Sequence, residues 1–179
     1  PPHARKLVQT VCELADRHGT DSGVVRAWIA NSKHRSAWAA RTIQALLLDA
    51  RPDATVAIWG LAYKENTHSV KNSPSLATIA ALPNARLRVF DPVVQASVVN
   101  RAGITGAASA LDALSGAGAL LILTPWPEFR AIAPADMAAA MTGRTVLDPY
   151  AVLDRKAAAA AGLEVHTLGK ATPATFHHA

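Results

Sequence analysis

The sequence predicts an α/β fold, a Rossmann-like and mostly parallel sheet with flanking helices, preceded by a segment of long helices. Three observations support this fold. Apolar strands alternate with short helical stretches from Thr55 onward. The first strand stops at Gly60, and a polar loop then leads to a helix start at Ser73-Pro74. The residues before Arg51 carry apolar side chains at helical spacing instead. Such alternation is typical of a parallel sheet with helices on both faces.

The first part of the chain is predicted to be helical. Residues 5–18 form an amphipathic pattern, and a second, longer helix is expected over residues 21–50. A helix of that length suggests a spine between domains or subunits. Arg51-Pro52-Asp53 breaks the pattern. We therefore expect a helical segment over residues 1–51 and a Rossmann-like domain over residues 52–179.

In the second part, strands and helices are expected in turn. The expected strands are 55–59, 85–90, 119–123, 145–147 and 163–168, and the expected helices are 74–82, 94–102, 109–114, 134–141 and 153–161. Ligands of such sheets bind beyond the carboxyl ends of the strands. Four segments are expected there, namely 60–67, 91–92, 124–129 and 148–150.

Composition and charge narrow the class of protein. Half of the 179 residues are hydrophobic, so the chain can bury a substantial core. The formal net charge of +5 fits an anionic partner or a basic solvated surface. The basic residues are scattered, which argues against a nucleic-acid partner. Cys12 is the one cysteine, and no apolar run could span a bilayer, so we expect no disulfide framework, no membrane partner and a cytoplasmic location.

The turn after the first strand is the main candidate site, because Tyr63 and Lys64 lie there. A lysine ammonium offers donors and a positive charge for a phosphate, and backbone N–H groups of the turn can add to it. The alternative is a turn lysine that only contacts solvent. Of the pattern G-x-G-x-x-G only Gly60 is present, so a standard NAD site in this domain is not expected.

Two further residues follow strand ends. Asp91 stands where Rossmann folds keep an acid for a ribose hydroxyl, but without the glycine pattern we favour a plain Asp-Pro turn. Trp126 lies between two prolines. It could stack on a base or cover the end of the sheet, and we favour the second role.

Other chemistries find no support in the sequence. The seven histidines show no metal-ligand spacing, so no metal site is expected. The motifs H-E-x-x-H, C-x-x-C and G-x-S-x-G do not occur, which argues against zinc hydrolase, redox and serine hydrolase activities. Cys12 lies in a helical pattern and is interpreted as a buried thiol.

Residues Gly60 to Thr67, followed by Lys71-Asn-Ser-Pro74, resemble the C-terminal domain of the UDP-glucose/GDP-mannose dehydrogenase family. That family's turn reads roughly G-[FL]-[AS]-[FY]-K-x-[DN]-T and then R-x-S-[PS]. Further stretches are similar to the family in the same order, namely 88–92, 124–130 and 163–170. The segment around Ile29-Ala-Asn31 is similar to the central helix that builds the family's dimer.

The resemblance implies an NAD-dependent oxidoreductase that converts the C6 hydroxyl of a nucleotide sugar to an aldehyde and then to an acid, in polysaccharide biosynthesis. The family's nucleophilic cysteine and its GxGxxG cofactor domain lie upstream of the part matched here. We therefore expect no catalytic residue in this chain and NAD bound mainly by an upstream domain. The resemblance also implies a homodimer through the 21–50 helix.

By matching position, Lys64 is similar to the family's substrate-binding lysine, and Tyr63 to the aromatic residue beside it at the nucleotide. Lys71 takes the place of an arginine that reaches the cofactor, keeping its charge without its bidentate geometry. Tyr150 and Ala151 stand where the family's D-G-R-x-V-L-D motif has basic residues that hold the sugar nucleotide.

The sequence leaves alternatives open. A non-catalytic Rossmann-like binding or dimerisation module would explain the replaced basic residues at Tyr150 and Ala151. A methyltransferase-like or receiver-like domain shares the alternation of strands and helices but lacks its own motifs here. The sequence names neither the sugar nor the base.

Overall fold

The computed structural model describes residues 2–170, with side chains from residue 7 onward. The chain divides into two compact units, Pro1–Trp38 and Ala39–Ala179. Each unit is described by itself.

The first unit is a hairpin of two helices, α1 (Pro2–His18) and α2 (Gly23–Ser36). Gly19 ends α1 with a positive φ of 64°, a conformation that glycine adopts without strain. Few side chains are buried between the helices, and α2 has no buried residue. Several large apolar side chains are exposed instead, namely Leu7, Val11, Leu14, Val24 and Trp28.

The prediction of one continuous helix over 21–50 is wrong. α2 ends at Ser36, and it is followed by α3 (Trp38–Ile43) and by η1, a π-helical segment at Gln44–Leu48. The wider turn of a π-helix shifts the side chains around the axis, and Leu47 and Leu48 are both buried as a result. Leu47 lies against Gly118, where an added Cβ would be 3.3 Å from a Leu47 methyl. Residues 39–51 therefore belong to the second unit, whereas the sequence had placed its boundary near residue 51.

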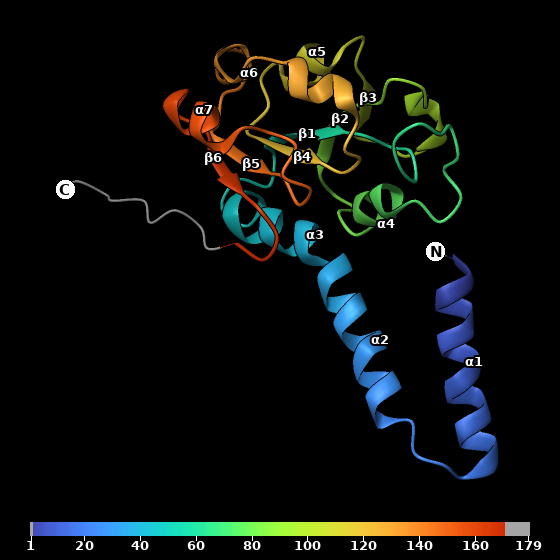
Figure 1. Cartoon of the computed structure of the whole chain (residues 1–179). Coiled ribbons are helices and arrows are strands. Elements are labelled where there is room, and N and C mark those ends of the chain that lie inside the picture. Colours follow the sequence, from blue (N-terminus) through green and yellow to red (C-terminus); the bar gives the residue numbers. More distant parts are fainter. Residues whose placement is uncertain (1, 171–179) are drawn as a thin grey trace. The chain divides into compact units, whose positions relative to one another are not determined.

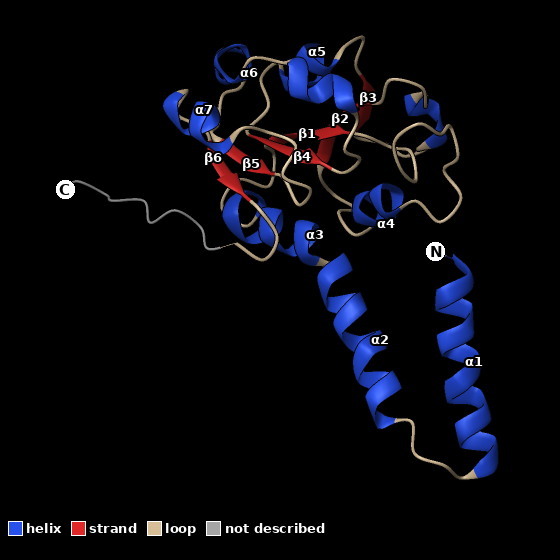
Figure 2. Ribbon diagram, viewed as in Figure 1, coloured by secondary structure: helices blue, strands red, loops and turns tan. Residues whose placement is uncertain are grey.

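The second unit contains a six-stranded sheet whose strands are all parallel (Figure 2). The strands are β1 (Thr55–Trp59), β2 (Arg86–Phe90), β3 (Ile104–Gly106), β4 (Ala119–Ile122), β5 (Thr145–Leu147) and β6 (Glu164–His166). Their order is β3-β2-β1-β4-β5-β6, which is the order of a Rossmann fold. The predicted fold class is confirmed.

The two central strands carry the core. Every residue of β4 is buried, and in β1 only the first residue is partly exposed, as expected for strands covered on both faces. Trp59 at the end of β1 stacks on Phe129 with ring centroids 4.8 Å apart. Phe129 also meets Phe90 edge-on at 6.4 Å, so three aromatic rings tie the ends of β1, β2 and the segment after β4 together.

Helices cover both faces of the sheet (Figure 1). α5 (Ala110–Leu114), α6 (Pro134–Ala140) and α7 (Arg155–Ala160) lie on one face, and α4 (Pro74–Ala80) lies on the other. Ser73, Ser109 and Asp154 cap the amino ends of α4, α5 and α7 by accepting hydrogen bonds from backbone N–H groups. A 3-10 segment, η3 (Pro127–Ala131), follows β4.

One predicted helix is wrong. Residues 94–102 form only a single 3-10 turn, η2 (Ala96–Val98), and the short strand β3 after them was not predicted. The β-branched run Val98-Val99 and Asn100 disfavour a helix, and a three-residue edge strand leaves little hydrophobic pattern to detect. Within residues 2–170, no helix has the length and apolar character needed to cross a bilayer.

Candidate functional site

The four predicted strand-end segments lie at one edge of the sheet, because all strands are parallel. The direction in which the strands follow one another changes between β1 and β4. Ligands of open α/β sheets bind at such a topological switch point, beyond the carboxyl ends of the strands. The loops at this edge are 60–73 after β1, 91–95 after β2, 123–126 after β4 and 148–154 after β5.

The switch point itself is closed by Gly60 and Thr124. Gly60 has φ +97°, and a Cβ built on it would lie 2.4 Å from the Thr124 Cβ. The Thr124 hydroxyl donates to the Ala62 carbonyl at 2.9 Å, which fastens the loop after β1 to the end of β4. Only glycine permits this close approach.

Asp91 connects the loops after β1, β2 and β4, because its carboxylate accepts hydrogen bonds from all three. Oδ2 accepts from the backbone N–H groups of Leu61 at 2.7 Å and Ala62 at 3.0 Å, and from the Trp126 indole N–H at 3.0 Å. Oδ1 accepts from the backbone N–H groups of Val93 at 3.0 Å and Val94 at 2.9 Å.

These contacts keep Asp91 charged. Burial of the carboxyl would raise its pKa, but hydrogen bonds from four backbone N–H groups outweigh burial and hold the pKa below its ordinary value of 3.8. The charge is balanced by N–H dipoles, and among the side chains described, residues 7–170, no cation forms an ion pair with it.

The contacts of Asp91 bear on two expectations from the sequence. All of its hydrogen bonds are to the protein, which agrees with the favoured interpretation of Asp91-Pro92 as a plain turn and not with an acid kept for a ribose hydroxyl. Trp126 is 3% exposed and donates to Asp91, which confirms that it covers the sheet end. The N–H groups of Leu61 and Ala62 donate to Asp91, so these two groups of the turn are not free to bind a phosphate.

The first backbone N–H groups after β1 are not free for a diphosphate. In a dinucleotide-binding fold these groups lie at the pyrophosphate, whereas here those of Leu61 and Ala62 donate to Asp91. This agrees with the missing glycine pattern.

The loop 60–73 carries the predicted residues Tyr63, Lys64 and Lys71. The loop is closed by a hydrogen bond from the Tyr63 N–H to the Ser69 carbonyl at 2.8 Å and by one from the Ser73 hydroxyl to the Leu61 carbonyl at 2.8 Å. Tyr63 is partly buried, whereas Lys64 and Lys71 are exposed. Among the described residues, neither ammonium group has a hydrogen-bond or ion-pair partner.

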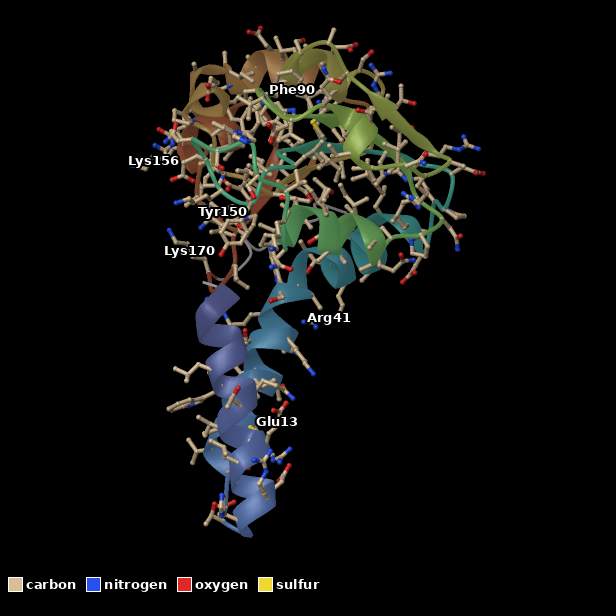
Figure 3. All side chains as sticks on the ribbon, turned by 90° about the vertical axis from the view of Figure 1, so that its right-hand side faces the viewer. Glu13, Arg41, Phe90, Tyr150, Lys156 and Lys170 are labelled. Carbon is tan, nitrogen blue, oxygen red and sulfur yellow. The ribbon has the colours of Figure 1, made fainter. Side chains whose placement is uncertain are left out.

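The loop 148–154 presents Tyr150. Asp148 is fully buried at the end of β5, and its carboxylate accepts from the Tyr150 N–H at 3.3 Å and from the Leu153 N–H at 2.9 Å. Ala151 is held in the left-handed region with φ 54°. Tyr150 remains 46% exposed, and its side chain is labelled in Figure 3.

Backbone strain is concentrated in these two loops. In the described part of the chain, the residues other than glycine with positive φ are Asn66, Asn72 and Ala151. Such conformations cost energy and persist where the surrounding structure imposes them, which is common at ligand sites.

The phenol of Tyr150 is affected by a charge from another loop, the Glu65 carboxylate. The pKa of Tyr150 is raised above its ordinary value, first by burial of the phenol and second by the Glu65 carboxylate. This electrostatic effect could not be predicted from the sequence, because β4 lies between β1 and β5 in the sheet and no local pattern links their loops. Glu65 is a residue that sequence reasoning missed.

A hollow of about 540 Å³ opens at the opposite edge of the sheet. It is lined by residues at the amino ends of β1, β4 and β5, including Arg51, Thr55, Gly118 and Thr142. It contains none of the predicted site residues. Among residues 7–170, whose side chains are described, no three His, Cys, Asp or Glu side chains are grouped so that they could hold a metal ion.

The chain is similar to known dehydrogenases. Residues 57–155 match the family described as "UDP-glucose/GDP-mannose dehydrogenase family, UDP binding domain". The UDP-glucose 6-dehydrogenase of Pseudomonas aeruginosa is 34% identical over 134 residues, which cover 70% of this chain and 30% of that protein. The UDP-glucose 6-dehydrogenase of Rhizobium meliloti is 32% identical over 136 residues, covering 74% of this chain and 30% of that protein.

Solved structures share the fold. The UDP-D-ManNAc dehydrogenase from Pyrococcus horikoshii superposes with a TM-score of 0.68 at 23% identity, over 87% of this chain and 35% of that one. The chain therefore spans about a third of the length of the proteins it matches. The resemblance noted in the sequence is confirmed.

Proposed function

Since the chain belongs to the UDP-glucose/GDP-mannose dehydrogenase family, through its UDP-binding domain, we propose that it is the nucleotide-sugar-binding part of an NAD-dependent nucleotide-sugar 6-dehydrogenase. The observation that carries this proposal is the loop 60–73. It lies at the switch-point edge and presents an exposed lysine, Lys64, that has no hydrogen-bond or ion-pair partner among the described residues.

Lys64 is the proposed phosphate-binding residue. Because Asp91 takes the N–H groups of Leu61 and Ala62, the diphosphate binds through the lysine side chain, farther out from the sheet than in a dinucleotide fold. An ammonium group serves as a point charge for a phosphate. Tyr63, the partly buried neighbour of Lys64, would lie against the nucleotide, and Lys71 would reach the cofactor.

The chemical steps are assigned to another part of the enzyme. Cys12 is 4% exposed on α1 and belongs to the first unit, whereas Lys64 belongs to the second. We therefore place the nucleophile and the main NAD-binding domain upstream of this domain, as in the family. A single thiol that is buried and free of disulfide supports a cytoplasmic enzyme of polysaccharide biosynthesis.

A homodimer through the 21–50 helical region is the proposed assembly. Within this region, α2 has no buried residue and exposes Val24 and Trp28. Apolar side chains four residues apart on one helix form a stripe that water solvates poorly and that another helix can cover. Sedimentation of the parent chain and of Trp28→Ser tests this assembly, and a parent chain that stays monomeric at high concentration would rule it out.

The experiment that tests the binding role is a calorimetric titration with UDP and UDP-glucose. Lys64→Ala is expected to weaken binding at least about tenfold, because a charge-assisted contact to phosphate is lost. Arg51→Ala is the matched control, since it removes one exposed positive charge at the opposite edge of the sheet. Equal losses in both variants would show a non-specific charge effect, and an unchanged affinity in Lys64→Ala would reject the assignment.

A further inference from the structure

The position of the Lys64 side chain depends on the backbone that carries it. Its ammonium group has no hydrogen-bond or ion-pair partner among the described residues, so no contact of its own fixes where the charge lies. The backbone just before it, at Leu61 and Ala62, is fixed instead by side chains from other segments of the chain. These side chains therefore decide from where Lys64 extends.

Ala62 is held at both of its backbone polar groups. Its N–H donates to Asp91 Oδ2 at 3.0 Å, and its carbonyl accepts from the Thr124 hydroxyl at 2.9 Å. Ala62 is fully buried, so water cannot replace either partner in the folded protein. The residue two positions before Lys64 is thus fixed by residues 29 and 62 positions farther along the chain.

The Trp126 indole fixes the carboxylate that holds Ala62. Its N–H donates to Asp91 Oδ2 at 3.0 Å, the same oxygen that accepts from the N–H of Ala62. Pro125 and Pro127 flank Trp126 and restrict the backbone on both sides of it. The segment after β4 therefore holds the turn after β1 through two side chains, directly by a hydroxyl and through Asp91 by an indole.

We propose that Thr124 and Trp126 are positioning residues for ligand binding, and that they act on Lys64 through the backbone of Ala62. The inference rests on the proposed function, because it assumes that Lys64 binds the phosphates of a nucleotide sugar. Thr124 is 1% exposed and Trp126 is 3% exposed, so neither side chain is available to the ligand itself. Their effect on binding is indirect.

Loss of either contact releases part of this arrangement. Without the Thr124 hydroxyl, the buried Ala62 carbonyl has lost its donor, and without the indole, Asp91 Oδ2 keeps only its two backbone donors. A shift of about 1 Å in the turn then misplaces the lysine, and charge-assisted hydrogen bonds depend steeply on distance and angle. We expect the affinity for UDP to fall about fivefold in either case.

Trp126→Phe tests the indole contact, because phenylalanine keeps an aromatic ring and lacks the N–H. Trp59→Phe is the matched control, since Trp59 also donates from a buried indole, to the Ala110 carbonyl at 2.9 Å at the start of α5. Both variants lose one buried hydrogen bond and some ring volume, so both should lower the melting temperature. Only Trp126→Phe should weaken UDP binding about fivefold in a calorimetric titration.

Thr124→Val and Thr124→Ser test the hydroxyl contact. Valine has nearly the shape of threonine without the hydroxyl, whereas serine keeps the hydroxyl. Thr124→Val is expected to weaken UDP binding about fivefold, and Thr124→Ser is expected to stay within about twofold of the parent. This pair decides the question alone if circular dichroism shows that Trp126→Phe does not fold.

A double-mutant cycle shows whether these residues act through Lys64. The effect of Trp126→Phe on the affinity for UDP is measured in the parent and again in Lys64→Ala. If Trp126 positions the lysine, its substitution has no further effect once the lysine side chain is absent. The same loss in both backgrounds means that Trp126 acts on binding by another route, and it overturns the proposal.

The outcomes separate this proposal from the proposed function. If Lys64→Ala weakens binding but Trp126→Phe and Thr124→Val keep the parent's affinity, the positioning role is rejected and the proposed function stands. Equal losses of affinity in Trp126→Phe and Trp59→Phe reflect general destabilisation and also reject the positioning role. If the parent chain does not bind UDP, the proposed function is rejected, and the positioning role with it.

Discussion

Gly60 lies so close to Thr124 that a side chain on residue 60 would place its Cβ 2.4 Å from that of Thr124. Gly60→Ala is therefore expected to lower the free energy of unfolding by about 3–5 kcal/mol, because it combines a positive φ with a collision against a β-strand end. Urea denaturation measures the change. Gly162→Ala is the control, since Gly162 has φ +80° but nothing within 4 Å of an added Cβ, and it should cost only about 1 kcal/mol. Similar losses in both variants would contradict the role of the close approach.

Asp91→Asn tests the carboxylate that joins the loops. An amide cannot accept hydrogen bonds at both of its polar atoms. We therefore expect the free energy of unfolding to fall by about 2–4 kcal/mol at neutral pH. Because the pKa of Asp91 is lowered by folding, its stabilisation is present above pH 3.8 and is lost as the pH falls through the folded-state pKa. The variant should therefore show a shallower fall in stability below about pH 4. Asp53→Asn, which alters an exposed ion pair with Arg86, should cost less than about 0.5 kcal/mol. An acid transition of unchanged slope in Asp91→Asn would count against this role.

The Tyr150 phenol can be titrated directly, since Tyr63 is the other tyrosine of the chain. In a Tyr63→Phe background, phenolate absorbance should report a pKa for Tyr150 above the ordinary value of 10.0. Adding Glu65→Gln should lower that pKa, because the carboxylate no longer disfavours the phenolate. The native state holds this proton more tightly than the unfolded state, so the contribution of Tyr150 to stability declines as the pH rises past 10.0. A pKa that does not respond to Glu65→Gln would show that the two loops do not interact.

Ala151→Gly should stabilise the protein by about 0.5–1 kcal/mol, because glycine adopts the left-handed conformation of residue 151 without strain. The comparison is Ala139→Gly in α6, an exposed helical position where glycine should destabilise by about 1 kcal/mol. Opposite signs in thermal denaturation would confirm the strain, and a loss of stability in both variants would argue against it.

The strands could be predicted from the sequence because their signals are local. β1 and β5 were predicted at their observed bounds, since apolar residues there are flanked by turn residues. The break at Ala37 and the π-helical segment 44–48 could not be predicted, because they depend on which leucines the sheet buries. β3 is stabilised by pairing with β2 and leaves almost no pattern of its own.

In the candidate site, too, residues on a continuous motif could be predicted, whereas contacts between distant segments could not. Tyr63, Lys64 and Lys71 were found because they lie on one continuous motif, and their binding roles remain predictions. The contacts of Asp91 with Leu61 and Trp126 join segments about thirty residues apart, and no local pattern reports them. The effect of Glu65 on the pKa of Tyr150 likewise depends on the order of the strands.

The internal carboxylate at position 91 has a consequence for the thermodynamics of recognition. Where a phosphate-binding turn is shaped by its ligand, part of the interaction energy is spent on ordering the chain. Here Asp91 already orders the first residues of the turn, so the proposed nucleotide-sugar ligand would bind to a turn that is already ordered. Association should therefore carry only a small penalty in backbone entropy, and its affinity should depend mainly on how well charges and hydroxyls match.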